Sequence, residues 1–385
     1  MSCWARAVAW PRAHPELARA AGLYTLLMAG LELVGVLSVQ FDRPLQLRGQ
    51  WIELLLRPGE PNPELVKIWE RWDALWYMQI AQHGYSATDG STAFFPLYPV
   101  LMHVVGAVFR DNYALAGLIL TAAVLIPALA CLEVLARTVV GPEAARRAVL
   151  YTAIFPTAFF LFAPYTEGVF LLLVVGSFLA MRSGRWGLAG LLGVLLGLTR
   201  AQGALLMLPM AWEWLEQRRL GTRRPWPSFL YTLGPGLGLL LFTAYIRFVV
   251  GQDQAGFATQ ANWGYHVVLP WQVLGASLSR VRLDPVEALN FASLALFSGL
   301  TIAAFRRLPF TYVLYSAVNI VLILTRQMDT WPLMSVSRYV LVLFPGFLML
   351  GLLGRRRWLH QTIYTVGLLT MTLLFYQYVH FRFVA

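Results

Sequence analysis

This 385-residue chain contains few charged residues: 13% of its residues are charged and 58% are hydrophobic. Soluble domains carry about 25% charged residues. Lys67 is the only lysine, so the 30 basic residues are almost all arginines, and they face 19 acids. The two cysteines, Cys3 and Cys131, exclude a disulfide framework and a cysteine metal site. This composition nearly excludes a water-soluble enzyme.

Long apolar runs follow one another along the chain. A hydrocarbon core about 30 Å thick is crossed by about 20 apolar residues in a helix. Eleven predicted spans lie near residues 18–40, 113–136, 147–163, 166–181, 186–199, 201–215, 228–250, 286–305, 308–325, 339–353 and 358–380. The sequence therefore predicts an all-α polytopic membrane protein, residues 1–385 forming a single integral-membrane domain.

Arginines in the short connections predict the orientation, because Lys and Arg are held on the cytoplasmic side. Only four acids share these connections with 17 arginines, namely Arg6, Arg12, Arg19, Arg137, Arg146, Arg147, Arg182, Arg185, Arg218, Arg219, Arg223, Arg224, Arg306, Arg307, Arg355, Arg356 and Arg357. All 17 arginines fall on one side of the membrane only if residues 94–110 do not cross it. We expect a cell-membrane protein with a cytoplasmic N-terminus. The net charge of +11 then reports topology, and no nucleic-acid partner is predicted.

Three predicted outer loops are long, at residues 41–112, 251–285 and 326–338. Long loops in compact proteins are usually functional. The first contains a predicted amphipathic helix over Leu65–Tyr85 and an apolar segment over Ala93–Arg110 that lies in or on the outer leaflet. We expect the chemistry to face outwards.

Asp73 lies on an aromatic face of the predicted Leu65–Tyr85 helix. On a helical wheel this face also carries Trp69, Trp72, Trp76, Ile80 and His83, with Tyr77 at its margin. A helix in the membrane interface explains the aromatic residues. It does not explain a carboxylate among them, which costs free energy without a partner. Asp73 is therefore a candidate functional residue.

The segment around Asp73 resembles a known family, the PIG-V mannosyltransferases. The similar blocks are Trp69 with Arg71–Ala74, Trp76–Tyr77, Ile80–Ala81 and Gly84–Tyr85; then Phe94–Pro99, Phe155–Phe160, Pro164–Glu167, Leu198–Arg200 with Gly203, Ser337–Tyr339 and Phe344–Pro345. The resemblance implies a multi-spanning glycosyltransferase of the C superfamily (GT-C), with its active site on the outer face. It also implies a polyprenyl-phosphate sugar donor, usually of mannose, and Asp73 as the catalytic residue.

Inverting sugar transfer requires a base for the acceptor hydroxyl and stabilisation of the leaving group. Asp73 is our candidate base. No Asp-x-Asp sequence occurs, so we predict no metal site and no cofactor, and an arginine that holds the single phosphate of a lipid donor. The predicted partners are this donor, a lipid, glycan or protein acceptor, and membrane lipids.

Glu167 follows Thr166 at the start of a predicted span. It is a second catalytic candidate, but a role at a capped helix start explains it equally well. Arg338 is our first candidate for the donor phosphate and Arg200 the second, although isolated arginines at span ends commonly reach lipid headgroups. Further substrate-binding candidates are Trp72, Trp76, Tyr77, His83, Tyr98, Tyr165 and Tyr339.

Two other functions compete with an enzyme. Many spans and buried acids also suit a transporter or flippase for lipid-linked sugars, but transporters usually contain two related halves, and no internal repeat is visible. A non-catalytic scaffold subunit has no use for an acid in an aromatic loop. The sequence therefore favours a glycosyltransferase.

Overall fold

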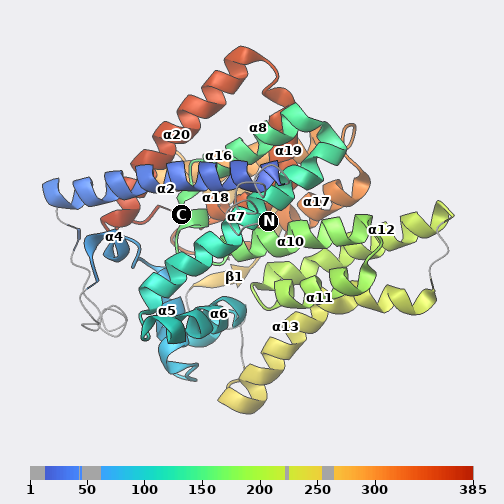
Figure 1. The fold of residues 1–385 in the computed structure, drawn as a ribbon. Helices are drawn as coiled ribbons and strands as arrows, with labels where there is room; N and C mark the ends of the chain where they lie inside the picture. Colours follow the sequence, from blue (N-terminus) through green and yellow to red (C-terminus); the bar gives the residue numbers. More distant parts are fainter. Residues whose placement is uncertain (1–13, 43, 46–61, 222–224, 254–263, 385) are drawn as a thin grey trace, which may run out of the picture.

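The computed structural model describes residues 14–42, 44–45, 62–221, 225–253 and 264–384. Parts of the predicted loops 41–112 and 251–285 lie outside the described residues, as do Arg6, Arg12, Arg223 and Arg224. Helices make up most of the described chain, and one small antiparallel pair of strands accompanies them (Figure 1).

Five helical segments of the described chain are long and apolar enough to cross a membrane. They are α2 (Pro15–Phe41), α7 (Tyr113–Val140), Trp226–Val250, α16 (Pro285–Ala304) and α20 (Arg357–Val379). The third of these joins η4 (Trp226–Leu233), α13 (Gly234–Tyr245) and η5 (Ile246–Val250). Shorter helices pack between them: α10 (Glu167–Arg182), α11 (Trp186–Gly197), α12 (Met207–Arg219) and α17 (Phe310–Leu324).

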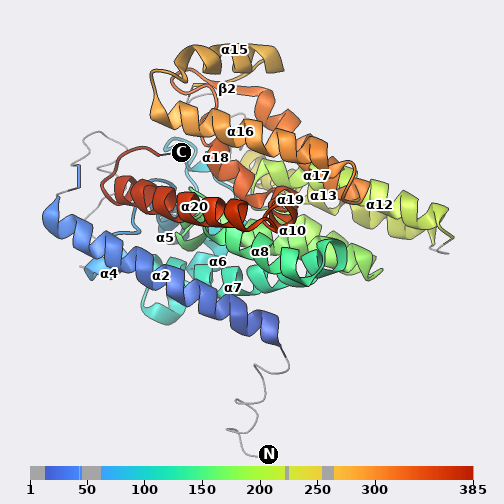
Figure 2. The same ribbon diagram turned by 90° about the horizontal axis from the view of Figure 1, so that it is seen from above.

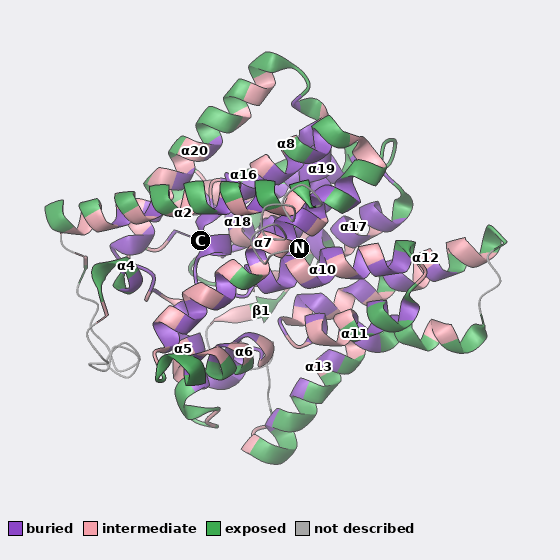
Figure 3. Ribbon diagram, viewed as in Figure 1, coloured by how far each residue is buried: buried purple, intermediate pink, exposed green. Residues whose placement is uncertain are grey.

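The outward faces of the peripheral helices are exposed, as Figure 3 shows for α2, α13 and α20. Large apolar side chains lie on these faces, for example Leu240 on α13 and Leu373 on α20. Because such a surface is unfavourable in water and suits lipid, the molecule is a multi-pass membrane protein. The predicted all-α polytopic class is confirmed, and the count of eleven crossings stays a prediction.

Two predicted spans are broken. In place of a helix over 147–163, α8 (Pro142–Ala153) ends before Pro156, and a single turn, α9 (Phe159–Phe162), follows. In place of a helix over 339–353, α18 (Val336–Tyr339) and η7 (Val340–Val342) meet α19 (Phe344–Leu353) at a bend of 81°. Proline removes a backbone donor and clashes with the preceding helical turn, so Pro156 and Pro345 prevent continuous helices here.

The single helix predicted over Leu65–Tyr85 is wrong. Two helices occupy this region, α4 (Glu64–Lys67) and α5 (Asp73–His83), because Trp72 has a positive φ of 52° that no α-helix continues through. After η1 (Ser91–Ala93), the predicted apolar segment forms α6 (Leu97–Gly106) and η2 (Ala107–Phe109). Figure 1 shows α5 and α6 side by side along α7.

The second and third predicted outer loops meet through a short antiparallel ladder. Strand β1 (Tyr265–Val267) pairs with β2 (Arg326–Met328), so that Tyr265 lies opposite Met328 and Val267 opposite Arg326. Helix α15 (Pro270–Arg280) follows β1, and Figure 2 shows it beside β2, outside α16. Two segments about sixty residues apart in the sequence thereby form one wall of the site described below.

The helix ends predicted to be cytoplasmic contact one another. The contacts are Arg19 to Glu133 at 2.5 and 3.2 Å, Gln217 to the Met181 carbonyl at 3.1 Å, Arg147 to the Gly351 carbonyl at 3.0 Å, and Thr311 to Glu213 at 2.6 Å. Helix ends that carry arginine-rich connections therefore lie next to one another in small groups.

Candidate active site

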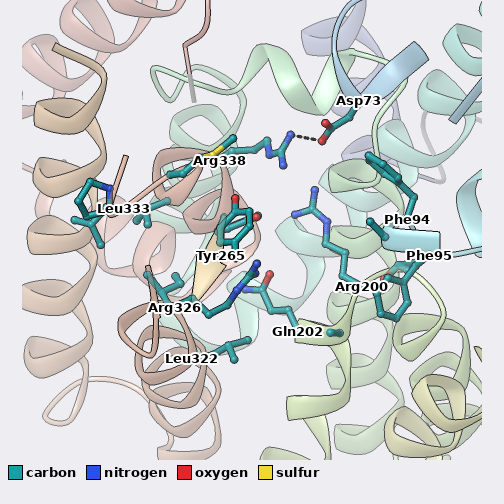
Figure 4. Close-up of a pocket in the computed structure, with 18 of the residues that line it drawn as sticks. Asp73, Phe94, Phe95, Arg200, Gln202, Tyr265, Leu322, Arg326, Leu333 and Arg338 are labelled. Atoms are coloured by element: carbon teal, nitrogen blue, oxygen red, sulfur yellow. Dashed lines mark hydrogen bonds and ion pairs between the residues drawn. The ribbon is translucent and has the colours of Figure 1, made fainter. Parts of the chain in front are cut away.

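A cavity lies where the three predicted outer loops meet. It encloses about 860 Å³ including its open mouth. Its walls come from α5, η1, the start of η3 (Ala201–Leu206), β1, the end of α17, β2, and α18 with the segment before it. Figure 4 shows Asp73, Arg200, Arg326 and Arg338 around this space, with Phe94 and Phe95 on one wall.

Asp73 is the first residue of α5 and projects into the cavity. Its Oδ2 accepts a hydrogen bond of 2.6 Å from Nη1 of Arg338, and 24% of its side chain is exposed. Of the residues that the structure describes, none donates to Oδ1. This charge-assisted hydrogen bond fixes the direction of Oδ2 and leaves Oδ1 facing the cavity.

Arg338 and Arg200 share a second carboxylate, that of Glu167. Glu167 Oε1 lies 3.3 Å from Nε of Arg338 and also accepts from Nη2 of Arg200. The Glu167 side chain is completely buried. The hydroxyl of Thr166 accepts a 2.7 Å bond from Nε of Arg200 and does not cap α10. Acids and arginines therefore alternate in a row, Asp73–Arg338–Glu167–Arg200.

The backbone before Arg338 is fixed by neighbouring elements. Ser335 has a left-handed φ of 64°, which turns the chain into α18. The next polar residue, Ser337, donates its N–H to Asn290 Oδ1 at 2.9 Å and accepts from the Thr157 hydroxyl at 2.6 Å. Arg338 thus extends from a segment that is bonded to α16 and to the turn after α8.

Aromatic rings surround the Arg338 guanidinium. The ring centres of Phe160, Tyr165 and Tyr339 lie 5.4 to 5.6 Å from its central carbon. Cations are attracted to aromatic faces at such distances. Tyr77 lines the same cavity, and burial raises the pKa of its phenol far above the usual value, so Tyr77 remains a neutral hydrogen-bonding group.

The cavity is also lined by residues that were not predicted from the sequence, namely Arg326, Tyr265 and Gln202. The Arg326 guanidinium lies 4.3 Å over the Tyr265 ring, and Gln202 lies nearby with 8% of its surface exposed (Figure 4). Arg326 follows a predicted span directly, as Arg200 does, and that position was an available signal. Tyr265 had no such signal, because a three-residue strand in a loop leaves no pattern. Among the described residues, no three His, Cys, Asp or Glu side chains are grouped to hold a metal ion.

Asp73 and Arg200 both lie in blocks that resemble the PIG-V family, and both line this one cavity. The mannosyltransferase (PIG-V) family model matches residues 63–207. The resemblance is thereby confirmed over the segment that contains Asp73, Glu167 and Arg200. No curated protein is similar enough in sequence to count as a match.

Among solved structures, one is similar in fold to this chain and a second is more weakly similar. ArnT from Cupriavidus metallidurans, bound to undecaprenyl phosphate, has a TM-score of 0.50 and 15% identity, over 86% of this chain and 60% of that one. The oligosaccharyltransferase of Archaeoglobus fulgidus, in complex with Zn and sulfate, has a TM-score of 0.41 and 13% identity, over 91% and 53%. The chain thus spans about 60% of the length of ArnT. The likeness to ArnT confirms the predicted fold, a helical membrane bundle of the GT-C type.

Five of the predicted site residues line the cavity, namely Asp73, Tyr77, Arg200, Arg338 and Tyr339. Others support its wall from behind. Trp76 is buried and stacks on Phe94 at 5.4 Å, and the buried Tyr165 donates to the Arg71 carbonyl at 3.1 Å.

Three predicted substrate-binding residues lie away from the cavity. Tyr98 is completely buried, and its hydroxyl bonds to the Gly117 carbonyl of α7 at 3.2 Å. Trp72 packs against residues that follow α20. His83 is exposed at the end of α5. The break at Trp72 explains the place of Trp72, because the helical wheel that grouped it with Asp73 assumed one continuous helix. His83 lies in the same helix as Asp73 but at its opposite end, about 15 Å along the axis.

Proposed function

We propose that the protein is a membrane mannosyltransferase. In this proposal it transfers a sugar from a polyprenyl-phosphate donor to an acceptor hydroxyl, with inversion, and Asp73 is the general base. The observation that carries the proposal is one cavity lined by the partly exposed Asp73 carboxylate, its partner Arg338, and the further arginines Arg200 and Arg326. A base and a cationic group for the leaving phosphate are what the reaction requires.

The charge of the cavity supports a lipid monophosphate donor. Arg200, Arg326 and Arg338 all line the cavity. Guanidinium groups bind a phosphate oxygen pair directly, so a lipid-phosphate donor needs no metal ion here. The ArnT crystal structure contains undecaprenyl phosphate, a ligand of the chemical class proposed here.

Arg338 stays our first candidate for the donor phosphate. Its Nη1 and Nε face Asp73 and Glu167, and its Nη2 is left for a ligand, since none of the described residues accepts from it. Arg200 is second, because its buried Nη1 has no partner within the described chain. Guanidinium groups suit phosphate because they present parallel donors.

Asp73 has one oxygen available for catalysis. While Arg338 holds Oδ2, an acceptor hydroxyl within hydrogen-bond reach of Oδ1 would lose its proton to that atom as its oxygen bonds to the anomeric carbon. The bond from that carbon to the phosphate oxygen breaks on the opposite side, and its electrons leave with the lipid phosphate. Attack opposite to the leaving group inverts the sugar.

Glu167 takes a different part from the one suggested by the sequence. It is fully buried and does not line the cavity, so we assign it no contact with substrate. Its carboxylate holds the guanidinium groups of Arg200 and Arg338 together. Glu167 is therefore a positioning residue in this proposal, and a helix-capping role is not favoured because Thr166 bonds to Arg200 instead.

We place the reaction on the extracytoplasmic face. Support comes from the loops that build the cavity, 41–112, 251–285 and 326–338, which are the three long loops that lack the arginine clusters. Arginine clusters are retained on the cytoplasmic side.

The test is an assay with purified protein in detergent, labelled polyprenyl-phosphate mannose, and a panel of lipid, glycan and peptide hydroxyl acceptors. Mass spectrometry of the product, with its anomeric configuration, identifies the acceptor and the stereochemistry. We expect an inverted mannoside and released polyprenyl phosphate. Movement of donor across liposomes without transfer to any acceptor would instead support a flippase.

A further inference from the structure

We propose that Phe383, in the segment after α20, is a positioning residue for the ion pair between Asp73 and Arg338. It acts through two tryptophans, Trp72 and Trp331. Its effect on the reaction rate rests on the proposed function, whereas its effect on the two loops does not.

The corner that aims Asp73 into the cavity is conformationally unfavourable. Trp72 has a φ of 52° and a ψ of −121°, a positive-φ conformation that a bulky aromatic residue rarely adopts. Asp73 follows immediately as the first residue of α5. Such a conformation persists only where surrounding contacts hold it, and the direction of the Asp73 carboxylate depends on those contacts.

The segment after α20 provides them. The Trp72 ring meets Phe383 edge-on at 5.7 Å and 87°, and meets Phe381 at 6.1 Å and 65°. Its neighbour Arg71 is 5% exposed, donates from Nε to the Val379 carbonyl at 2.7 Å, and lies 4.3 Å over the Phe381 ring. Edge-to-face ring pairs are a favourable aromatic arrangement. The corner is thus held by residues about three hundred positions later in the chain.

The same phenylalanine contacts the loop that carries Arg338. Phe383 stacks on Trp331 at 4.7 Å with an interplanar angle of 21°. Nε1 of Trp331 donates to Asp284 Oδ2 at 2.6 Å, and Oδ1 of Asp284 caps the first turn of α16. Trp331 lies directly before the cavity-lining Pro332 and seven residues before Arg338.

Phe383 therefore lies between the two loops whose charges pair in the cavity. Asp73 and Arg338 are 265 residues apart in sequence, so their distance depends on tertiary contacts of this kind. Phe383 itself does not line the cavity. It has no direct access to a bound substrate, which makes it a positioning residue.

Hydrogen–deuterium exchange of the purified full-length protein tests the link without any substrate. Phe383→Ala should speed amide exchange by about tenfold or more both in residues 69–73 and in residues 331–338, because local protection follows local stability. The matched control is Leu373→Ala on the exposed face of α20, which should change neither segment. Faster exchange in only one of the two loops, or in neither, would overturn the proposal.

A second variant approaches the link from its other side. Trp331→Ala should also speed exchange in residues 69–73, because Trp331 meets Trp72 through Phe383. An unchanged 69–73 segment in this variant would overturn the proposal even if Phe383→Ala failed to fold.

The kinetic test separates positioning from simple loss of fold. Phe383→Ala should lower kcat by about tenfold with the KM for donor within about twofold, since a slightly displaced base slows the chemical step. Phe383→Tyr, which keeps the ring, should restore kcat. A raised KM with unchanged kcat would contradict the positioning role. If the wild type transfers no sugar, the proposed function fails, and the exchange experiment still decides the structural link.

Discussion

Glu167→Gln should weaken the fold and the proposed reaction together. The change removes a fully buried charge that lies between two guanidinium groups. Removing one partner of a buried ion pair commonly costs about 3–5 kcal/mol, because the other charge is left uncompensated. Glutamine keeps an oxygen that accepts from Arg200, so we expect the lower end, about 3 kcal/mol. Displacement of the two arginines by about 1 Å should slow transfer by about a hundredfold.

The matched control is Glu143→Gln. Glu143 is also an acid in the first turn of a helix and pairs with an arginine, Arg146, but both side chains are exposed. Surface pairs and helix-dipole effects are each worth about 1 kcal/mol or less. We therefore expect a small loss of stability and unchanged transfer in this variant.

Both quantities are measurable on purified protein. Stability is followed by detergent-induced unfolding monitored by tryptophan fluorescence, and transfer by release of polyprenyl phosphate. A Glu167→Gln protein that loses no more stability than Glu143→Gln, with wild-type transfer, would refute the reasoning. That result would return Glu167 to an ordinary helix-start role.

Two further substitutions test the arginine proposed to bind the donor phosphate and the close contact between α11 and α13. Arg338→Lys keeps the charge but loses the planar pair of donors, so the KM for donor should rise about tenfold; unchanged donor affinity would count against Arg338 as the phosphate ligand. Gly238→Ala would place a Cβ 2.1 Å from the Val194 carbonyl oxygen, where α13 packs on α11, and should destabilise by about 1–3 kcal/mol. Gly30→Ala, with open space around its Cβ, is its control and should gain up to about 1 kcal/mol; equal unfolding of the two variants would contradict the close helix contact.

The membrane class was predictable, because apolar runs and arginine placement depend on local composition. The breaks were harder to predict. Trp72 lies in a helix-compatible sequence, and its positive-φ conformation depends on Phe381 and Phe383, far along the chain. The continuous helix over Leu65–Tyr85 was therefore a reasonable local prediction that tertiary contacts overrule. Pro156 and Pro345 were visible signals for the other two breaks.

The residues of the site were partly predictable, because some of them stand out in the local sequence. Arg200 and Arg338 were identifiable as charges at the ends of apolar segments, and Asp73 as an acid on an aromatic helix face; all three line the cavity. Their pairing was not, since Arg338 reaches Asp73 from 265 residues away. Arg326 and Tyr265 come together through a short ladder between two loops, and no sequence period encodes such a contact.

The most direct test of Asp73 as the base is the transfer rate of Asp73→Asn. Asparagine keeps the size of the side chain but does not accept the acceptor's proton, so the rate should fall by about a thousandfold, within the range of general-base effects. Asp111→Asn, in an exposed turn before α7, should transfer at the wild-type rate. Near wild-type turnover by a folded, membrane-inserted Asp73→Asn protein would contradict the account.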